Sequence, residues 1–104
     1  MKVIIRETLK FLPGKLDEGT KLLKRSLALS KEKIGFSSPI RKYTPWLGGG
    51  SSINTIIVEA EYESLTQMEE FLEKSMADPE MMEINRKWET ILESSKEELY
   101  MVMP

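Results

Sequence analysis

Charged side chains inside two extended segments are the first candidates for chemistry. Arg6 and Glu7 lie in the middle of the alternating segment at the N-terminus, and Glu59 and Glu61 share one face of a later segment. Two carboxylates on one face of a strand repel each other when both are charged, so the glutamate pair could act in general acid–base catalysis. The sequence favours the simpler alternative, in which this strand emerges into solvent.

The adjacent charges Arg6 and Glu7 have two interpretations. One of them could face a pocket, Arg6 as an anion clamp or Glu7 as a proton acceptor. The sequence favours an ion pair at the sheet or at a dimer interface, because buried charges are normally paired. A further polar candidate is Asn54, which shares a face with Val58 and could orient a substrate carbonyl or satisfy nearby backbone groups. The predicted catalytic candidates are therefore Arg6, Tyr43, Asn54 and Glu59.

Four large aromatic side chains are the predicted ligand contacts: Tyr43, Trp46, Trp88 and Tyr100. A pocket built from such rings suits a flat aromatic or polyketide-like molecule. Trp88 has the spacing of a core residue in its helix, so packing is the simpler interpretation there. Trp46 comes directly before a glycine-rich loop, where an exposed ring would call for a ligand or a partner. The glycines 48–50 precede a strand instead of a helix, which indicates a hairpin loop and not a phosphate site.

The chain contains no histidine and no cysteine. This composition excludes disulfides, thiolate nucleophiles and the usual zinc sites, so the sequence predicts neither a metal nor another cofactor. Proton chemistry would have to use carboxylates, tyrosine, lysine or the substrate itself. The net charge is −2, from 15 basic and 17 acidic residues, which disfavours nucleic acid as a partner. No apolar run is long enough to cross a membrane or to form a signal peptide, so we expect a cytoplasmic protein that does not bind membranes.

The elements that would position these residues follow from the hydrophobic periodicity. Alternation predicts strands, and a 3.6-residue period predicts helices. A Ser64-x-x-Gln67 capping box opens one late helix, and Asp78-Pro79 opens the next. The resulting order is β-α-β-β-α-α-β over a single domain, residues 1–104. The predicted strands are 2–11, 40–46, 53–62 and a last one after residue 95. The predicted helices are 15–34 and two that begin at residues 64 and 78.

This order predicts an α+β fold. Apart from the split second helix, it is the ferredoxin-like βαββαβ plan with a four-stranded antiparallel sheet. The third strand, 53–62, carries apolar residues on both faces, which predicts burial from both sides. The chain has helices enough for one face only, so a second copy of the chain is the simplest cover for the other. The sequence therefore predicts a homodimer.

Three stretches resemble NIPSNAP-like proteins. They are residues 6–18, which contain Pro13-Gly14 after a strand, residues 61–65 and residues 77–80. The resemblance implies a dimeric α+β barrel, in which two protomers pack their sheets face to face and each keeps a pocket between its sheet and its helices. The wider superfamily includes cofactor-independent monooxygenases, haem-degrading enzymes, dehalogenases and isomerase-like enzymes, as well as members without a known activity. Haem-degrading members use an Asn, Trp and His set, and the missing histidine argues against such a site here.

Two functions remain open at this level. The first is an enzyme-like protein that binds or transforms a small hydrophobic or aromatic molecule without metal; as an enzyme it would have a cofactor-independent oxygenase- or isomerase-like activity. Its sheet–helix pocket would contain Arg6, Tyr43, Asn54 and Glu59 as polar members. The second is a non-catalytic homodimeric binding or assembly module. An open cavity with an unpaired carboxylate or arginine beside Tyr43 or Trp46 favours the first. A pocket closed by Leu and Met side chains, with every polar group paired, favours the second.

Overall fold

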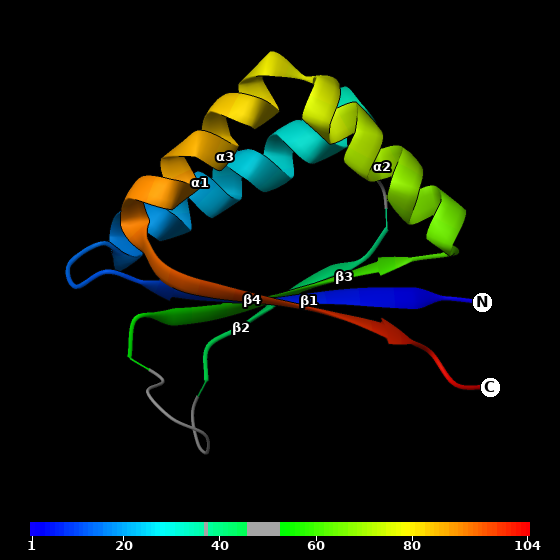
Figure 1. Ribbon diagram of the computed structural model, residues 1–104, viewed down its shortest axis with the longest axis horizontal. Coiled ribbons are helices and arrows are strands. Elements are labelled where there is room, and N and C mark those ends of the chain that lie inside the picture. The colour runs from blue at the N-terminus through cyan, green and yellow to red at the C-terminus, as the bar shows by residue number, and fades with distance from the viewer. Residues whose placement is uncertain (37, 46–52) are drawn as a thin grey trace.

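A four-stranded antiparallel sheet, covered on one face by helices, forms the frame of the protein (Figure 1). The computed structural model describes residues 1–36, 38–45 and 53–104. The strands are β1 (Val3–Phe11), β2 (Ile40–Tyr43), β3 (Thr55–Tyr62) and β4 (Leu92–Met101), and the helices are α1 (Leu16–Leu29), the π-helix η1 (Ser30–Ile34), α2 (Leu65–Ala77) and α3 (Pro79–Ile91). The strand order in the sheet is β2-β3-β1-β4. These elements confirm the predicted ferredoxin-like α+β fold with its second helix split in two.

The predicted capping signals begin α2 and α3 at the expected residues. The Ser64 hydroxyl accepts a hydrogen bond from the backbone N–H of Gln67 at 3.1 Å. The Asp78 carboxylate accepts hydrogen bonds from the N–H groups of Glu80 and Met81 at 2.9 and 3.1 Å. These bonds satisfy backbone donors that a helix leaves free in its first turn. The break between α2 and α3 is therefore encoded locally.

The strand ends differ from the predicted ones around the hairpin between β2 and β3. β2 ends at Tyr43 and β3 begins at Thr55, so Asn54 lies in the turn before β3. The φ of Asn54 is 59°, a left-handed conformation that asparagine tolerates, and its carbonyl accepts a hydrogen bond from the N–H of Phe11 at 2.8 Å. The prediction that Asn54 lies within the strand is therefore wrong, because turn geometry overrides the apolar pattern here. The predicted ligand contact Trp46 lies outside the described residues.

Two further boundaries differ in detail. The predicted helix 15–34 changes from α to π geometry at Ser30 and ends at Gly35, whose φ of 78° is the left-handed conformation expected of a C-terminal glycine cap. β4 begins at Leu92, directly after α3, instead of after residue 95. The last strand is therefore longer than predicted and includes two serines.

The helix-facing side of the sheet carries two apolar clusters. Leu9 and Phe11 of β1 belong to the first, and Val3 and Ile5 belong to the second. Their buried partners from other elements are Leu22, Leu23, Val58, Ile84 and Ile91 in the first cluster, and Phe36 and Tyr62 in the second. Along β1 the two clusters are separated by Glu7, which points to the same side of the strand.

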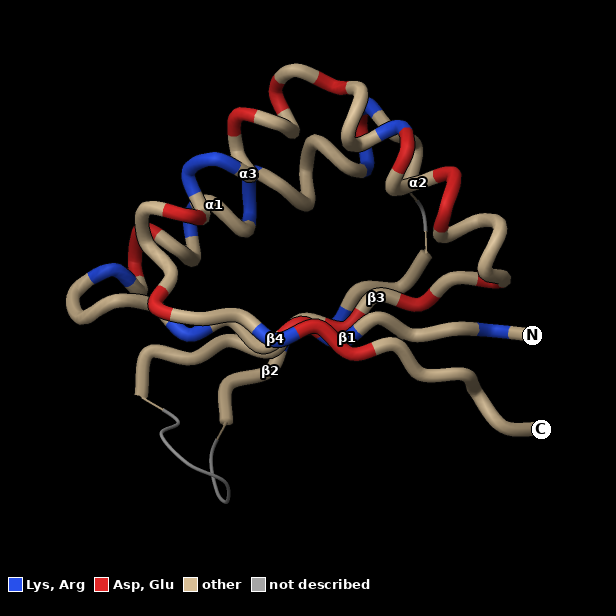
Figure 2. The backbone as a smooth tube through the Cα atoms, in the orientation of Figure 1, with Lys and Arg blue, Asp and Glu red and all other residues tan. Residues whose placement is uncertain are grey.

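The side of the sheet that faces away from the helices is the outer face. No helix in the described part of the chain covers it (Figure 1). Charged residues occur in the middle of the sheet as well as along the helices (Figure 2). In the strand register, Arg6 of β1 lies opposite Glu59 of β3 and Glu98 of β4, so three charges of both signs meet at the centre of this face.

Candidate functional site

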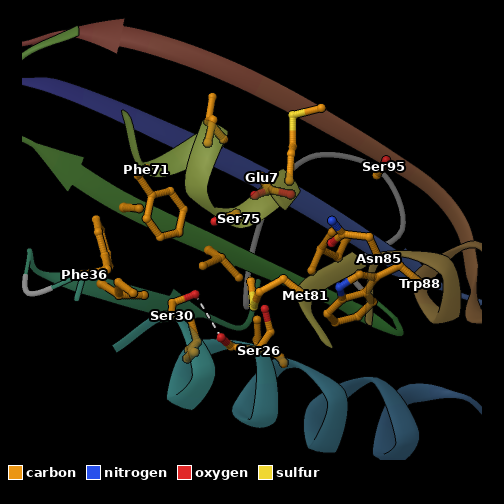
Figure 3. Close-up of a pocket in the computed structure, with 18 of the residues that line it drawn as sticks. Glu7, Ser26, Ser30, Phe36, Phe71, Ser75, Met81, Asn85, Trp88 and Ser95 are labelled. Atoms are coloured by element: carbon orange, nitrogen blue, oxygen red, sulfur yellow. Dashed lines mark hydrogen bonds between the residues drawn. The ribbon is translucent and has the colours of Figure 1, made fainter. Parts of the chain in front are cut away.

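A cavity of about 640 Å³ lies between the sheet and the helices (Figure 3). Ligand pockets in proteins have volumes of about 300–1,000 Å³, so this cavity can take a small organic molecule. All four strands contribute residues to its floor, and α1, η1, α2 and α3 contribute its walls. Most of the lining is apolar. The rings include Phe36, Phe71 and Trp88, and the polar groups include Glu7, Tyr62 and Ser75.

Glu7 is the charged residue on the cavity floor. It alternates along β1 with Ile5 and Leu9, both buried, so the strand directs its side chain toward the helices and into the cavity (Figure 3). The solvent-accessible area of Glu7 makes it an exposed residue, but this area opens onto the cavity. Protein atoms surround most of the side chain. Its carboxylate makes no hydrogen bond or ion pair with the described residues. An unpaired carboxylate therefore opens onto the cavity, but Tyr43 does not line this cavity and Trp46 lies outside the described residues.

Two features of this environment raise the pKa of Glu7 above its ordinary value. The larger is burial, which disfavours the charged form. The second is the negative charge of Glu97, which lies directly opposite Glu7 on β4. A carboxyl group whose pKa is raised is a stronger base when ionised and is more easily protonated than an ordinary carboxyl group. Glu7 is thus suited to proton transfer.

The raised pKa of Glu7 predicts a pH-dependent stability. Between its pKa in the unfolded chain and its higher pKa in the folded protein, the folded state binds more protons, so stability falls as the pH rises. We expect Glu7→Gln, which removes this ionisation, to raise Tm above the wild-type value at about pH 8, and we expect the difference to vanish at about pH 4. Thermal unfolding followed by circular dichroism measures both. Glu69→Gln on the exposed side of α2 is the control, and an equal gain for Glu7→Gln at both pH values would contradict the prediction.

Tyr62 supplies a second titratable group to the cavity. It is 3% exposed and packs against Phe36 and Phe71, with ring centroids 5.1 and 5.9 Å away. Burial, followed by the negative charges of Glu7 and Glu97, raises the pKa of its phenol. The hydroxyl therefore stays protonated at neutral pH and can donate a hydrogen bond to an oxygen atom of a bound molecule.

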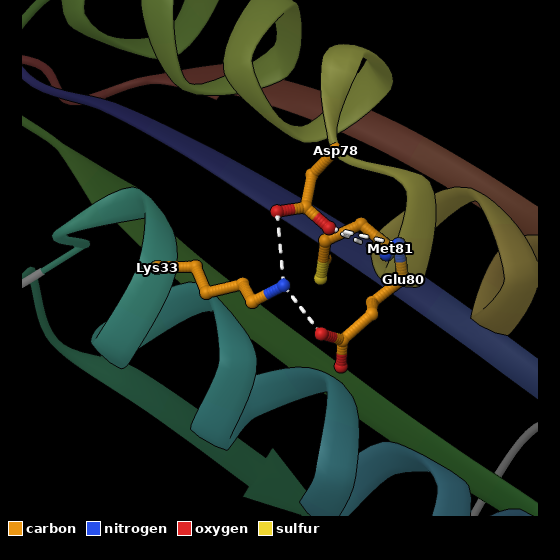
Figure 4. Close-up of polar contacts among 4 residues, drawn as sticks. All are labelled: Lys33, Asp78, Glu80 and Met81. Atoms are coloured by element: carbon orange, nitrogen blue, oxygen red, sulfur yellow. Dashed lines mark hydrogen bonds and ion pairs between the residues drawn. The ribbon is translucent and has the colours of Figure 1, made fainter.

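Ion pairs connect η1 to the junction of α2 and α3 above the cavity (Figure 4). Lys33 of η1 pairs with Glu80, and its Nζ lies 3.6 Å from Oδ2 of Asp78. Hydrogen bonds from the backbone N–H groups of Met81 and Glu80, together with the charge of Lys33, lower the pKa of Asp78. The Asp78 carboxylate therefore stays ionised and holds η1 against the start of α3. This contact fixes the end of α2, the helix that carries Ser75.

Arg6, Tyr43 and Glu59 lie together on the outer face and do not line the cavity. Nε of Arg6 donates to Oε2 of Glu59 at 2.7 Å, and the Tyr43 hydroxyl donates to Oε1 of Glu59 at 3.0 Å. The hydrogen bond from Arg6 lowers the pKa of Glu59, which is therefore a poor base. Arg6 also lies over the Tyr100 ring, 5.2 Å from its centroid. Arg6 thus forms the ion pair on the sheet that the sequence favours.

The second glutamate of this strand has a different partner. Glu61 lies 4.0 Å from Lys2, whereas Glu59 is held by Arg6. The two carboxylates are therefore compensated separately and do not form the acid–base pair that the sequence left as the less favoured alternative. The negative charge of Glu97 on β4 instead acts on Glu7 of the neighbouring strand β1.

The predicted aromatic contacts are divided between the two sides of the sheet. Trp88 lines the cavity and also packs against Phe11, with ring centroids 6.0 Å apart. Tyr100 lies on the outer face with Tyr43, and its hydroxyl donates to Oε2 of Glu98 at 2.6 Å. Of these rings, Trp88 alone is placed to touch a molecule in the cavity, as far as the described residues go.

Sequence reasoning leaves out Tyr62 and Ser75 and assigns Glu7 to an ion pair, although each carries a recognisable signal. Glu7 has the parity of the apolar residues of its strand, and Tyr62 has the parity of Val58. Ser75 follows Phe71 by four residues and so lies on the apolar stripe of its helix. A polar residue on an apolar face is the signal that all three share.

Two kinds of site are absent from the described residues. They contain no group of three or more acidic side chains placed to hold a metal ion. None of the helices in that part of the chain combines the length and the apolar composition that a membrane crossing requires.

Solved structures reveal which proteins share this architecture. A NIPSNAP family protein from Agrobacterium tumefaciens matches with a TM-score of 0.80 and 18% sequence identity, over 98% of this chain and 86% of that protein. The chain has the NIPSNAP fold. An uncharacterised NIPSNAP domain protein from Burkholderia xenovorans has a TM-score of 0.77 and 19% identity, over 99% of this chain and 95% of that one. The cofactor-independent oxygenase SnoaB from Streptomyces nogalater has a TM-score of 0.69 and 14% identity, over 99% and 94% of the two chains.

The NIPSNAP fold is recognised here through structure. No protein-family model matches the sequence, and no curated protein matches it significantly. The resemblance carried by residues 6–18, 61–65 and 77–80 is confirmed at the level of the fold, because these stretches form the turn from β1 to α1, the end of β3 with the start of α2, and the break between α2 and α3.

Proposed function

We propose that this protein binds a small apolar molecule in the sheet–helix cavity and that Glu7 exchanges a proton with it. The observation that carries the proposal is the position of Glu7, an unpaired carboxyl group that opens onto an apolar cavity. Stability alone favours a paired charge or an apolar residue at such a place. A carboxyl group with a raised pKa in a cavity is instead typical of a functional site.

Glu7 acts first as a base. Its carboxylate takes the hydrogen of an acidic C–H bond and forms an O–H bond, while the electron pair of the broken C–H bond moves onto an oxygen atom conjugated with that carbon. The protonated Tyr62 phenol is available to donate a hydrogen bond to this oxygen. Return of the proton to the same carbon completes an exchange, and return to a different carbon completes an isomerisation.

The comparisons support this class of chemistry. SnoaB, which is similar in fold, is a cofactor-independent oxygenase. Proton transfer by Glu7 likewise uses a side chain of this protein and the bound molecule only. The apolar rings around the cavity, from Phe36, Phe71 and Trp88, suit a substrate with a ring system.

Proton exchange from a carbon acid tests this function. The probe is β-tetralone, a bicyclic ketone with acidic C–H bonds, dissolved in D2O with the protein, and the loss of its acidic hydrogens is followed by proton NMR. We expect the protein to accelerate the exchange above the rate in buffer and to bind the probe in isothermal titration calorimetry. A protein that neither binds β-tetralone nor accelerates its exchange would overturn the proposal.

We also propose that the outer face of the sheet pairs with a second copy of the chain. Ile4 and Ile57 are only partly covered there, beside charges of both signs such as Arg41 and Glu61. A two-fold axis brings one surface against its own copy, so a face with both signs of charge can match basic residues with acidic ones. The similarity in fold to NIPSNAP proteins supports this homodimer.

Sedimentation velocity at micromolar concentration tests the pairing. We expect the wild type to be a dimer and Glu59→Arg to move it toward monomer, because the substitution places a second positive charge beside Arg6 at the centre of the outer face. Glu69→Arg makes the same change of charge on exposed α2 and is expected to leave the dimer intact. A monomeric wild type would overturn the proposed dimer. A dimer whose cavity binds no probe would favour the alternative function, a non-catalytic homodimeric binding or assembly module.

A further inference from the structure

Ser75 of α2 is buried in the wall of the cavity without a hydrogen-bond partner. The residue is 7% exposed, and its hydroxyl oxygen exposes less than 1 Å². Among the described residues, this oxygen has no hydrogen-bond partner. Figure 3 shows Ser75 among the side chains that surround the cavity, on the helix side, with Glu7 on the sheet side.

Ser30 is the informative comparison, because it is a second buried serine in the same lining. Its hydroxyl donates to the Ser26 carbonyl at 2.9 Å, so its burial leaves no polar group unsatisfied. A buried hydroxyl without a partner lowers stability, and alanine would fill the place of Ser75 without that loss. The fold therefore gives no reason for a hydroxyl group at Ser75, whereas an oxygen atom of a bound molecule does.

We propose that Ser75 binds a carbonyl oxygen of the substrate, which makes the substrate class a ring ketone with an acidic C–H bond beside its carbonyl group. This inference rests on the proposed function. Glu7 enters the cavity from the sheet and Ser75 from α2, so a molecule between them can present its C–H bond to one and its oxygen to the other (Figure 3). The Ser75 hydroxyl is carried on a single rotatable bond with three staggered positions, so it can turn toward the cavity.

The Ser75 contact becomes stronger as the reaction proceeds. When Glu7 removes the proton, the electron pair of the C–H bond moves onto the carbonyl oxygen, which becomes a negatively charged enolate oxygen. A hydrogen bond to a charged oxygen is stronger than one to a neutral oxygen. Ser75 therefore binds the ketone in the ground state and stabilises the enolate that follows.

Two probes that differ by one carbonyl group test the role of Ser75. β-Tetralone carries the carbonyl, and tetralin has the same two rings without it. By isothermal titration calorimetry we expect Ser75→Ala to weaken β-tetralone binding about threefold to tenfold, the value of one neutral hydrogen bond, and to leave tetralin binding unchanged. We also expect Ser75→Ala to raise Tm of the ligand-free protein by about 4 °C, because an unsatisfied buried hydroxyl disappears. Ser30→Ala removes a hydroxyl that has a partner and is expected to lower Tm.

The outcomes separate this inference from the function on which it rests. Equal weakening of both probes, no weakening of either, or a lower Tm for Ser75→Ala would overturn the assignment of Ser75. If the wild type still accelerates the exchange in that case, the proposed role of the cavity and of Glu7 stands. A wild type that binds neither probe would overturn both.

Discussion

Replacing Glu7 by glutamine is expected to slow the proton exchange of β-tetralone about 10²–10⁴-fold, the usual contribution of a positioned general base. Glutamine keeps the shape of the side chain, but its amide cannot accept the proton. Because the cavity walls are unchanged, β-tetralone binding by calorimetry should be retained. The rate is measured by proton NMR in D2O, with Glu69→Gln as the matched control on the exposed side of α2.

The pH profile identifies Glu7 as the base more sharply than the rate alone. The wild-type rate should rise as Glu7 ionises, with its midpoint at the raised pKa of that residue. Glu97→Gln removes the negative charge opposite Glu7, which is the second cause of the raised pKa, so the midpoint should move to lower pH. A wild-type rate in Glu7→Gln, or a midpoint unaffected by Glu97→Gln, would show that another group removes the proton.

Phe11→Ala is expected to lower the free energy of unfolding by about 3–5 kcal/mol, the largest stability effect that we expect from one substitution in this chain. Phe11 is 1% exposed, packs against Trp88 and lies directly beneath Gly19 of α1, where even a Cβ atom would overlap its ring. Loss of the ring therefore leaves a void between β1, α1 and α3. Urea unfolding followed by circular dichroism measures the loss.

Two control variants give reference values for the free energy that Phe11→Ala costs. Phe11→Leu keeps part of the volume and should cost less than Phe11→Ala. Lys21→Ala removes an exposed side chain of α1 and should change the free energy of unfolding by less than about 0.5 kcal/mol. A cost for Phe11→Ala close to that of Lys21→Ala would contradict the packing described for the first apolar cluster.

The fold is predictable from this sequence because its signals are local. The alternation in β1, the Ser64 cap and the Asp78-Pro79 pair act over a few residues, and each forms as expected. Asn54 is different, because a left-handed turn residue beside an apolar run looks like part of the strand. The length of β3 depends on that turn geometry and not on composition.

The candidate site is less predictable because it depends on contacts between distant segments. The types of residue do not reveal that Arg6 and Glu59 face each other from neighbouring strands, which requires the strand register. Glu7 is the exception. Its parity with Val3 and Leu9 already places a carboxyl group on the buried face, so the side of the sheet that it occupies could be predicted from the alternation alone.

The cavity itself cannot be predicted from the pattern of apolar residues. That pattern assigns Met68, Phe71 and Leu72 to one stripe of α2, but it does not reveal how closely the stripe approaches the sheet. The volume left above Glu7 depends on how α2 is held at its end by Asp78 and Lys33, a contact between segments far apart in the chain.

Arg6 and Glu7 are consecutive in β1 and point to opposite sides of the sheet. A single layer of strands therefore separates the cavity from the outer face. Inserting or deleting one residue in β1 before Arg6 would turn Arg6 toward the cavity and Glu7 toward the outer face, with little change in the composition of the strand. Many substitutions in β1 should therefore be better tolerated than any change in its length. A library of single-residue insertions and deletions should accordingly find β1 far more sensitive than the turn at residues 12–15.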